Sequence, residues 1–291
     1  MRRQINITCV HPGGGTVLVD QGRPGQRAQG IPASGPADQR VAARIWDILQ
    51  LPSGAPLLEF TLSGGQWLIS GEGQICLGGA EMNWKLNGRP AEAYTTIDID
   101  GDFLLDGSFA KRGCRAYLGV RGQWDVTPLM DSVSPGIPGL PTIAEGWSVQ
   151  INCAEEVPYT SDLEPCQHCP ELPYAFTVIP GPEWSNFSAN EQQQVLDQVY
   201  QVGQDSSRQG LRLLPQLDKT TPDTQAEKAV DPANNQLTMI SAPVLPGTIQ
   251  LSPAGPILLL YDAQTVGGFP RVLLLDKDDD INVAGQLKPG D

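Results

Sequence analysis

The sequence is poor in histidine and cysteine, with two and six respectively in 291 residues. A histidine-based triad would have to use His11 or His168, and no G-x-S-x-G nucleophile elbow accompanies either of them. Cysteines this sparse do not form a disulfide scaffold and are typical of a reducing compartment. The sequence also lacks a G-x-x-x-x-G-K-[ST] loop and a G-x-G-x-x-G turn that opens a helix, which excludes the standard phosphate cradles.

Long apolar runs and an excess of positive charge are also missing. The longest apolar candidate, 257–261, has the length of a strand, whereas a membrane-spanning helix needs about 20 residues. The first ten residues have a basic beginning but no apolar core, so we do not expect a signal peptide. The net charge of -14 and the pI near 4.5 disfavour nucleic acids and anionic membrane surfaces. We expect a soluble, cytoplasmic protein that binds small molecules or protein partners, with no nucleic acid and no membrane.

The composition favours a mainly β protein with a few short helices, because 32 glycines and 26 prolines suit many strands joined by turns. Short β-branched or alternating segments recur along the chain, and predict strands at 5–10, 15–19, 56–62, 65–70, 74–79, 81–86, 94–99, 115–120, 175–181, 211–215, 237–241, 248–252, 257–261 and 271–275. The apolar stripe of Val41, Ile45, Trp46 and Leu49 predicts a helix over 38–49. A second helix is predicted to begin at Ser188, where Glu191 completes a capping box.

Two domains are expected, at 1–158 and 172–291, because strand periodicity stops near residue 153 and proline and acidic residues accumulate. The polar segment 219–236 is interpreted as a surface insertion. The pair Cys166 and Cys169 beside His168 favours incidental thiols, since no second ligand pair follows at a comparable spacing; a metal site and a redox role stay open. The acidic segment 98–102 is interpreted as a strand end and turn, and 276–280 as a solvated loop. No metal site is expected.

Three Gly-rich segments contain more charged, carboxamide and hydroxyl side chains than a turn requires. They are 19–40, 206–213 and 261–270. The first contains Arg23, Arg27, Ser34 and Asp38, and the second contains Arg208. Arginine can clamp a carboxylate or phosphate, and consecutive glycines let backbone N–H groups converge on an anion. The carboxamide of Gln264 complements an amide or ureido group. Together the segments suit a small anionic substrate that also carries an amide, although each alone is more often a structural turn.

Several motifs, in their order and spacing, resemble the family of C-type subunits of 5-oxoprolinase, also labelled biotin-dependent carboxyltransferase or allophanate hydrolase subunit 2 and including Kip-type regulatory proteins. The motifs are "TVLVDQGRPGQRAQGIPASGPAD", "LLEFTLSGGQWLI", "VIPGPE", "SSRQGLRL", "PGTIQLSPAGPILLLYDAQTVGGFP" and "LKPGD". The similarity runs from about residue 5 to 291. It implies two cyclophilin-like β-barrel subdomains. It also implies ATP-dependent opening of 5-oxoproline to L-glutamate, together with homologues of the KipI-like B-type and the A-type subunits.

The resemblance implies a site made of residues from all three Gly-rich segments and of two residues outside them, Glu59 and Gln250. The expected catalytic residues are Arg208, Gln264, Thr265 and Asp38. The expected substrate-binding residues are Arg23, Ser34, Glu59, Gln250, Gly267 and Gly268. Asp38 or Glu59 is the expected proton carrier, with helix capping as the alternative role of Asp38. ATP with Mg²⁺ is expected to be shared with a partner subunit. Biotin is not expected on this chain, because no Met-Lys or Lys-Met pair is present. A biotin-dependent carboxyltransferase related to urea amidolyase and a Kip-type regulatory binding protein are the alternative functions.

Overall fold

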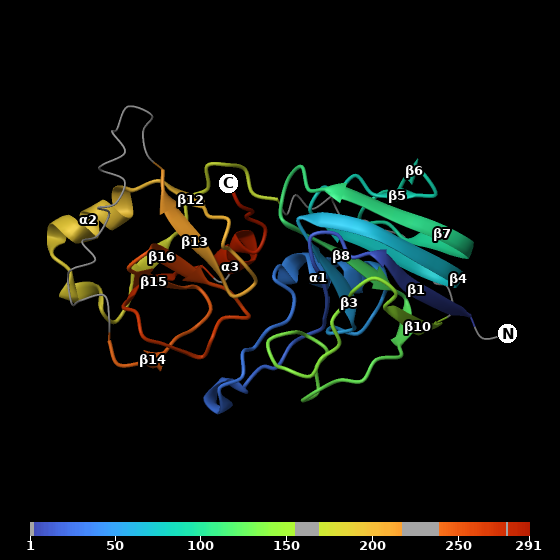
Figure 1. Cartoon of the computed structure of the whole chain (residues 1–291), viewed down its shortest axis with the longest axis horizontal. Helices are drawn as coiled ribbons and strands as arrows, with labels where there is room; N and C mark the ends of the chain where they lie inside the picture. Colours follow the sequence, from blue (N-terminus) through green and yellow to red (C-terminus); the bar gives the residue numbers. More distant parts are fainter. Residues whose placement is uncertain (1–2, 155–168, 217–238, 278) are drawn as a thin grey trace. The chain divides into compact units, whose positions relative to one another are not determined.

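The structure, a computed structural model, describes residues 3–154, 169–216, 239–277 and 279–291. The described chain is mainly β with three short α-helices (Figure 1), which confirms the predicted fold class. It divides into two compact units. The first unit contains residues 1–24 and 33–170, and the second contains 25–32 and 171–291. The short segment 25–32, early in the chain, therefore belongs to the second unit.

The first unit is built on a ten-stranded antiparallel sheet. Seven of its strands follow the order β2-β3-β8-β4-β1-β10-β9. The other three branch from β4, where β7 pairs with β4, β5 pairs with β7, and β6 pairs with β5. The strands are β1 (Gln4–His11), β2 (Thr16–Val19), β3 (Leu57–Thr61), β4 (Ser63–Gly79), β5 (Lys85–Leu86), β6 (Arg89–Pro90), β7 (Ile97–Phe109), β8 (Arg115–Val120), β9 (Gly122–Trp124) and β10 (Ser148–Cys153). The 17-residue β4 pairs with β1, β7 and β8 along different parts of its length. The strands predicted at 65–70 and 74–79 are thus one strand.

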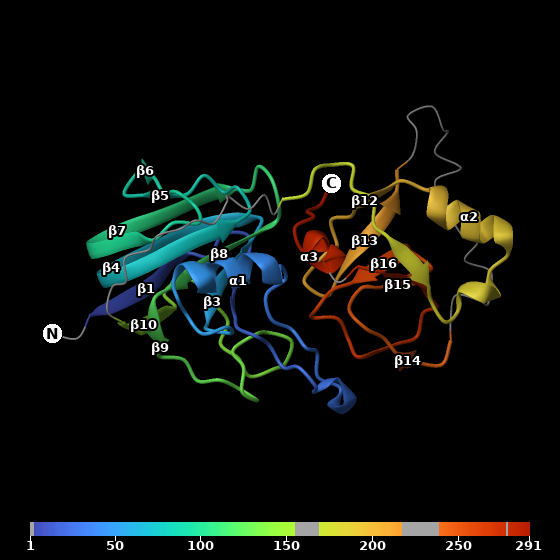
Figure 2. The same ribbon diagram turned by 180° about the vertical axis from the view of Figure 1, so that it is seen from behind.

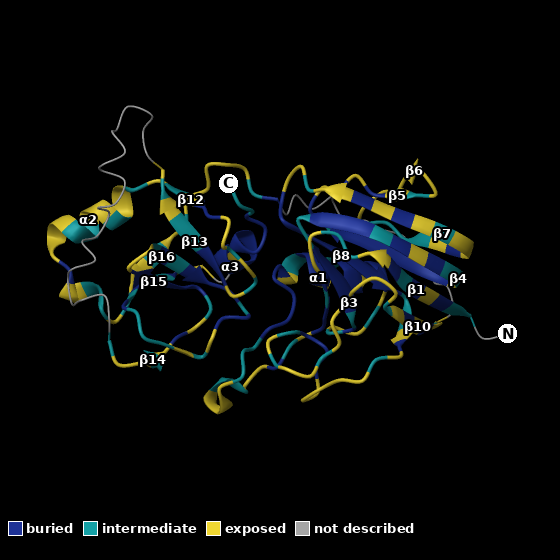
Figure 3. Ribbon diagram, viewed as in Figure 1, coloured by how far each residue is buried: buried dark blue, intermediate teal, exposed yellow. Residues whose placement is uncertain are grey.

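Strands β4 and β7 each have a glycine with an unusual backbone angle at one paired position. Gly71 on β4 pairs with Gly101 on β7, and both have positive φ, at 119° and 114°. A Cβ at Gly71 would lie 2.0 Å from the carbonyl oxygen of Gln4 on β1, so only glycine fits there. The interpretation of 98–102 as a turn was wrong, because β7 continues through it. Its three aspartates are exposed, whereas Ile99 between the first two is buried, as the colours along β7 show (Figure 3).

Helix α1 (Gln39–Ile48) packs on β3, β4 and β8 of the first unit (Figure 2). Asp38 is its N-cap, and the carboxylate accepts a hydrogen bond from the backbone N–H of Arg40 at 3.1 Å. Ile45 and Leu49 are fully buried in the same cluster as Tyr117. The helix predicted over 38–49 is confirmed, because its cap and its apolar stripe are both local features of the sequence.

The second unit contains a six-stranded antiparallel sheet with the order β11-β18-β15-β16-β13-β12. Its strands are β11 (Val178–Pro180), β12 (Tyr200–Val202), β13 (Gly210–Pro215), β15 (Thr248–Ser252), β16 (Gly255–Leu259) and β18 (Arg271–Leu275), and β14 (Ala242–Pro243) pairs separately with β17 (Val266–Gly267). The helical segments are η1 (Arg27–Gln29), η2 (Trp184–Asn186), α2 (Ala189–Asp197) and α3 (Asp280–Ala284). Ser188 and Glu191 form the predicted capping box of α2.

Two local predictions in the second unit were wrong. Residues 239–241 of the strand predicted at 237–241 are not in a strand. The solvated loop predicted at 276–280 ends in α3, where Asp280 is buried and accepts hydrogen bonds from the Tyr174 hydroxyl at 2.9 Å and the Thr177 N–H at 3.2 Å. A carboxylate with two such donors can be buried at the start of a helix. Cys166, His168 and the predicted insertion 219–236 lie outside the described residues. No helix within the described ranges is long and apolar enough to cross a membrane.

Candidate functional site

The predicted site residues fall into two groups, one in each unit. The second unit contains Arg208, Gln250, Gln264, Thr265, Gly267 and Gly268, and the first contains Arg23, Ser34, Asp38 and Glu59. The second group gathers around the 261–270 loop, which connects β16 to β18 and contains β17. This loop is where the polar chemistry of the second unit is concentrated, and we treat it as the candidate site.

Arg208 fixes the beginning of the 261–270 loop. Its Nε donates to Asp262 Oδ2 at 2.7 Å and its Nη2 donates to Oδ1 at 3.1 Å. Both side chains are mostly buried, with relative exposures of 13% and 7%. A bidentate pair of this kind is among the stronger and more directional ion pairs in proteins. The Arg208 guanidinium is therefore engaged by a carboxylate of its own chain, and it positions the loop.

A chain of carboxamide hydrogen bonds holds the centre of the loop. The buried Gln250 donates from Nε2 to the carbonyl of Phe269 at 2.9 Å, and its Oε1 accepts from Nε2 of Gln264 at 3.4 Å. Gly267 packs directly on this amide, since a Cβ there would lie 2.5 Å from Gln250 Nε2. The Gln264 side chain is exposed. The network thus presents one oriented carboxamide to solvent, supported by a second that is buried.

The remaining residues of the loop are tied to the segment 239–244 through their backbones. The N–H of Val244 donates to the Thr265 carbonyl at 3.0 Å, and the N–H of Met239 donates to the Gly268 carbonyl at 3.0 Å. The side chain of Thr265 is half-buried. These two backbone hydrogen bonds anchor the loop. Thr265, which carries a hydroxyl, directly follows Gln264 in it.

Arg27 joins the loop from an early part of the chain. Its Nη2 donates to the carbonyls of Val244 at 2.5 Å and Gln264 at 3.1 Å. Burial lowers the pKa of the Arg27 guanidinium below its usual value. The sequence pointed to the Gly-rich segment that contains Arg27, but it selected Arg23 in that segment. No local signal distinguishes the two, because glycines with positive φ flank both arginines: Gly22 and Gly25 around Arg23, and Gly25 and Gly30 around Arg27.

Arg23 has a different role, in the first unit. It is buried, and its guanidinium donates to the backbone carbonyls of Ser134 at 2.7 Å, Ser132 at 2.9 Å and Leu129 at 3.1 Å. Asp20 fixes the same loop by accepting from the hydroxyls of both serines. Arg23 is therefore a clamp for the loop 129–135, with its donors directed at backbone oxygens.

Asp38 and Glu59 do come together, in the interior of the first unit. The N–H of Asp38 donates to the Tyr117 hydroxyl at 2.9 Å, and the adjacent N–H of Ala37 donates to Glu59 Oε2 at 2.9 Å. Glu59 also pairs with Arg115 at 3.5 Å, and all four charged or phenolic side chains are fully or almost fully buried. Burial, followed by the charges of Glu59 and Asp38, raises the pKa of Tyr117 well above its usual value. Ser34, at φ 55°, lies buried just before this cluster.

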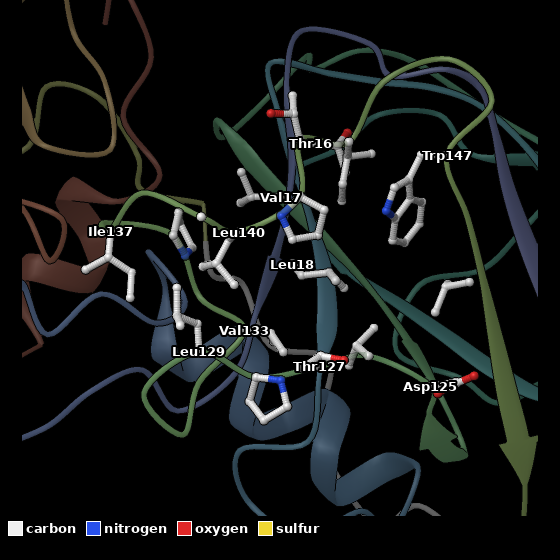
Figure 4. A pocket seen from close by; sticks show the side chains of 18 of the residues that line it. Thr16, Val17, Leu18, Asp125, Thr127, Leu129, Val133, Ile137, Leu140 and Trp147 are labelled. Carbon is white, nitrogen blue, oxygen red and sulfur yellow. The ribbon is translucent and has the colours of Figure 1, made fainter.

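The first unit also contains a cavity of about 570 Å³ that none of the predicted site residues lines (Figure 4). Leu129, Ile137 and Leu140 lie on one side of it, and Asp125 and Trp147 lie on the other. The wall that contains Leu129 is the loop that Arg23 clamps. The sequence offered no signal for this cavity, because its walls come from separate strands and a loop whose polar residues are used internally.

Neither a metal centre nor a thiol nucleophile is indicated by the described residues. They contain no group of three or more His, Cys, Asp or Glu side chains that could hold a metal ion. Burial raises the pKa of the Cys9, Cys153 and Cys169 thiols, and that of Cys76 to about 12. Because the thiolate is the nucleophilic form, these four cysteines are poorly suited to covalent catalysis.

Comparison with known proteins gives consistent results. The C-type subunit of the 5-oxoprolinase of Escherichia coli is 30% identical over 290 residues, which cover 96% of this chain and 87% of that protein. A urea amidolyase of Lachancea kluyveri is 28% identical over 304 residues and matches 96% of this chain, but the match is only 16% of that protein.

Solved structures show the same fold. The urea amidolyase of Kluyveromyces lactis superposes with a TM-score of 0.81 at 24% identity, over 98% of this chain and 18% of that chain. The protein TTHA0988 superposes with a TM-score of 0.80 at 24% identity, over 98% of this chain and 54% of that one. This chain therefore spans about half of TTHA0988 and a smaller part of the amidolyase. The family described as "Carboxyltransferase domain, subdomain A and B" matches residues 29–291, and the chain belongs to this family.

Proposed function

We propose that the chain is the C-type subunit of a cytoplasmic, heteromeric 5-oxoprolinase that opens the lactam of 5-oxoproline to L-glutamate with A-type and B-type partners. The extent of the match supports this assignment. The chain corresponds to 87% of the C-type protein of the E. coli 5-oxoprolinase, whereas it corresponds to a small part of the urea amidolyases.

The observation that carries the proposal is the exposed carboxamide of Gln264, oriented by the buried Gln250 at 3.4 Å. Ring opening places negative charge on the lactam oxygen, and pre-oriented donors stabilise such charge. We propose that Gln264 and the Thr265 hydroxyl donate to this oxygen. Gly267 allows the loop to lie against Gln250, and Arg208 holds the loop through Asp262. Arg208 and Gly267 are then positioning residues.

Asp38 and Glu59 are proposed to act as structural groups in this chain. Both carboxylates are fully buried, and both accept hydrogen bonds within the first unit. A proton carrier must reach the substrate or a water molecule in contact with it. We therefore propose that the proton is carried by a group on a partner protein or by water at the 261–270 loop.

ATP is proposed to bind mainly on a partner protein of the assembly. The described residues do not fit a Mg²⁺–nucleotide site: they contain no acidic cluster for the metal, and Arg208 and Arg271 in the second unit pair with Asp262 and Glu183. The bound nucleotide would supply the phosphoryl group that activates the otherwise unreactive amide. No step of that chemistry is assigned to residues of this chain.

The test is reconstitution with the cognate A-type and B-type proteins. ADP release that depends on 5-oxoproline is expected when the B-type protein is mixed with this chain, and L-glutamate is expected when the A-type protein is added. Each protein alone serves as the control. If a matched set of all three shows no stimulation of ADP release by 5-oxoproline, the proposed function is wrong.

A biotin-dependent carboxyltransferase acting on a urea-type amide is the second candidate, because urea amidolyases are 26–28% identical over nearly the whole chain. In that case biotin would be carried by a partner. Avidin detection of a biotinylated partner in the purified complex, with urea-dependent turnover, would favour this candidate. A regulatory binding protein would instead keep its partner affinity when Gln264 is replaced by alanine.

A further inference from the structure

The turn that carries Gln26 and Arg27 contains two buried polar atoms that its own chain does not satisfy. Nη1 of Arg27 and Oε1 of Gln26 are enclosed, and neither has a hydrogen-bond partner among the residues that the structure describes. Enclosed polar atoms in native proteins nearly always have partners, since an unsatisfied one has lost its hydrogen bonds to water without replacement. One of the two atoms is a charged donor, and the other is a neutral acceptor.

The turn is attached to the candidate site within the second unit. Nη2 of Arg27 donates to the carbonyl of Gln264, the residue whose carboxamide faces solvent, and to the carbonyl of Val244. Asp262, two residues before Gln264 in the loop, pairs with Arg208. The guanidinium of Arg27 therefore lies at the 261–270 loop with its charge uncompensated by a carboxylate in the described chain.

The turn is bounded by a glycine at each end. Gly25 and Gly30 flank it with φ of 83° and 82°, and a Cβ at either position would meet no atom within 4 Å. Glycine is thus needed at both ends for its backbone angle and not for space. No residue of η1 is buried. A ligand would reach the two enclosed atoms when this turn opens.

We infer that Gln26 and Arg27 form a subsite for an amide whose N–H and carboxylate are attached to the same carbon. Gln26 Oε1 would accept the N–H, and the Arg27 guanidinium would bind the carboxylate. In 5-oxoproline the lactam nitrogen and the carboxylate share one carbon, so a neutral acceptor and a cationic donor on adjacent residues match that edge of the molecule. Urea offers N–H groups but no carboxylate. This inference rests on the proposed function, and adds to it the reason for choosing an α-carboxylated amide.

The experiment compares two lactams on the reconstituted assembly: 5-oxoproline and 2-pyrrolidone, which is the same ring without the carboxylate. Their binding is measured by calorimetry, and KM and kcat for 5-oxoproline are measured alongside. The variants are Arg27→Gln and Arg27→Lys. The control is Arg89→Gln, which removes one positive charge from an exposed position on β6.

The wild-type assembly is expected to bind 5-oxoproline more tightly than 2-pyrrolidone, by about 10- to 100-fold. Arg27→Gln should remove most of this difference by raising KM for 5-oxoproline, with a smaller loss for 2-pyrrolidone because the hydrogen bonds from Nη2 to the loop are lost for both ligands. Arg27→Lys should restore part of the difference because it keeps the charge. Arg89→Gln should behave as the wild type.

Two results would overturn the inference. The first is equal binding of the two lactams by the wild type. The second is an equal loss for both lactams in Arg27→Gln, which would show that Arg27 only anchors the loop. Failure of the proposed function gives a separate result: the assembly would not turn over 5-oxoproline at all, and the binding comparison would still decide the role of Arg27.

Discussion

Arg208 and Asp262 form a bidentate ion pair, with 2.7 Å between Nε and Oδ2 and 3.1 Å between Nη2 and Oδ1. The pair joins the chain just before β13 to the chain just after β16, and it fixes the point where the 261–270 loop begins. Arg208 lies in a segment that resembles an anion-binding motif, yet the anion that it binds is part of the same chain. Its effect on the site is therefore exerted through the loop.

Replacing Arg208 by alanine should destabilise the second unit, because it leaves the Asp262 carboxylate buried without its partner. The expected loss in the free energy of unfolding is about 3 kcal/mol, measured by urea denaturation. Arg212→Ala, a neighbouring arginine for which no ion pair is formed in the described chain, is the control and should lose much less. Equal losses for the two variants would show that the ion pair does not hold the loop.

Gly267→Ala should impair the site, whereas Gly268→Ala should be tolerated. A Cβ on Gly267 would lie 2.5 Å from Gln250 Nε2, and one on Gly268 would lie 3.5 Å from its nearest neighbour. The first substitution must displace Gln250 and with it the hydrogen bond that orients Gln264. We expect 5-oxoproline-dependent ATP hydrolysis by the reconstituted assembly to fall at least about tenfold for Gly267→Ala only. Similar rates for both variants would contradict the importance of Gln250.

Substitutions of Asp38 distinguish a helix cap from a proton carrier. Asp38→Asn keeps an oxygen acceptor for the N–H of Arg40 but loses the ion pair with the Arg40 side chain, at 3.1 Å between Nε and Oδ1, so it should lose about 1 kcal/mol of stability while turnover stays close to that of the wild type. Asp38→Ala removes the acceptor and should cost about 1–2 kcal/mol in thermal or urea unfolding. If Asp38→Asn stays folded and assembles normally but abolishes turnover, Asp38 is a proton carrier and its role is not limited to capping the helix.

The ion pair of Glu183 and Arg271 should make the second unit sensitive to acid. Hydrogen bonds from Arg271, at 2.6 Å between Nη2 and Oε1, hold the pKa of Glu183 below its ordinary value of 4.5. A carboxylate with a lowered pKa in the folded state contributes stability that is present above pH 4.5 and is lost as the pH falls through the folded value. Glu183→Gln should cost about 1 kcal/mol at pH 7 and flatten the decline in stability at low pH. If Glu183→Gln loses stability at low pH as steeply as the wild type does, this assignment is contradicted.

The features that could be predicted from the sequence are those with local causes. Helix α1 begins at Asp38 and α2 at Ser188 because a capping side chain and an apolar stripe or an acidic partner lie within one turn. The mainly β class follows from short alternating segments. The 17-residue length of β4 and the passage of β7 through 98–102 could not be predicted. Both depend on the pairing of β4 with β7, including that of Gly71 with Gly101, and strand pairing joins residues that are distant in the sequence.

The sequence predicted which loop forms the candidate site, but it did not predict the contacts that hold this loop. The 261–270 loop was identified by residue type, because a carboxamide and paired glycines exceed what a turn requires. Its partners are distant in the chain: Arg208 is 54 residues from Asp262, and Arg27 is 237 residues from Gln264. Residue type alone could not tell that Arg23 binds backbone oxygens while Arg27, four positions later, reaches the loop.

The most direct test of the central claim is the effect of Gln264→Ala on kcat/KM for 5-oxoproline, in an assembly reconstituted with the A-type and B-type proteins. We predict a loss of at least about tenfold, because an oriented donor to the lactam oxygen is removed. The free energy of unfolding should change little, since the side chain is exposed. An unchanged kcat/KM for a chain that folds and assembles normally would contradict the claim that the 261–270 loop binds the substrate.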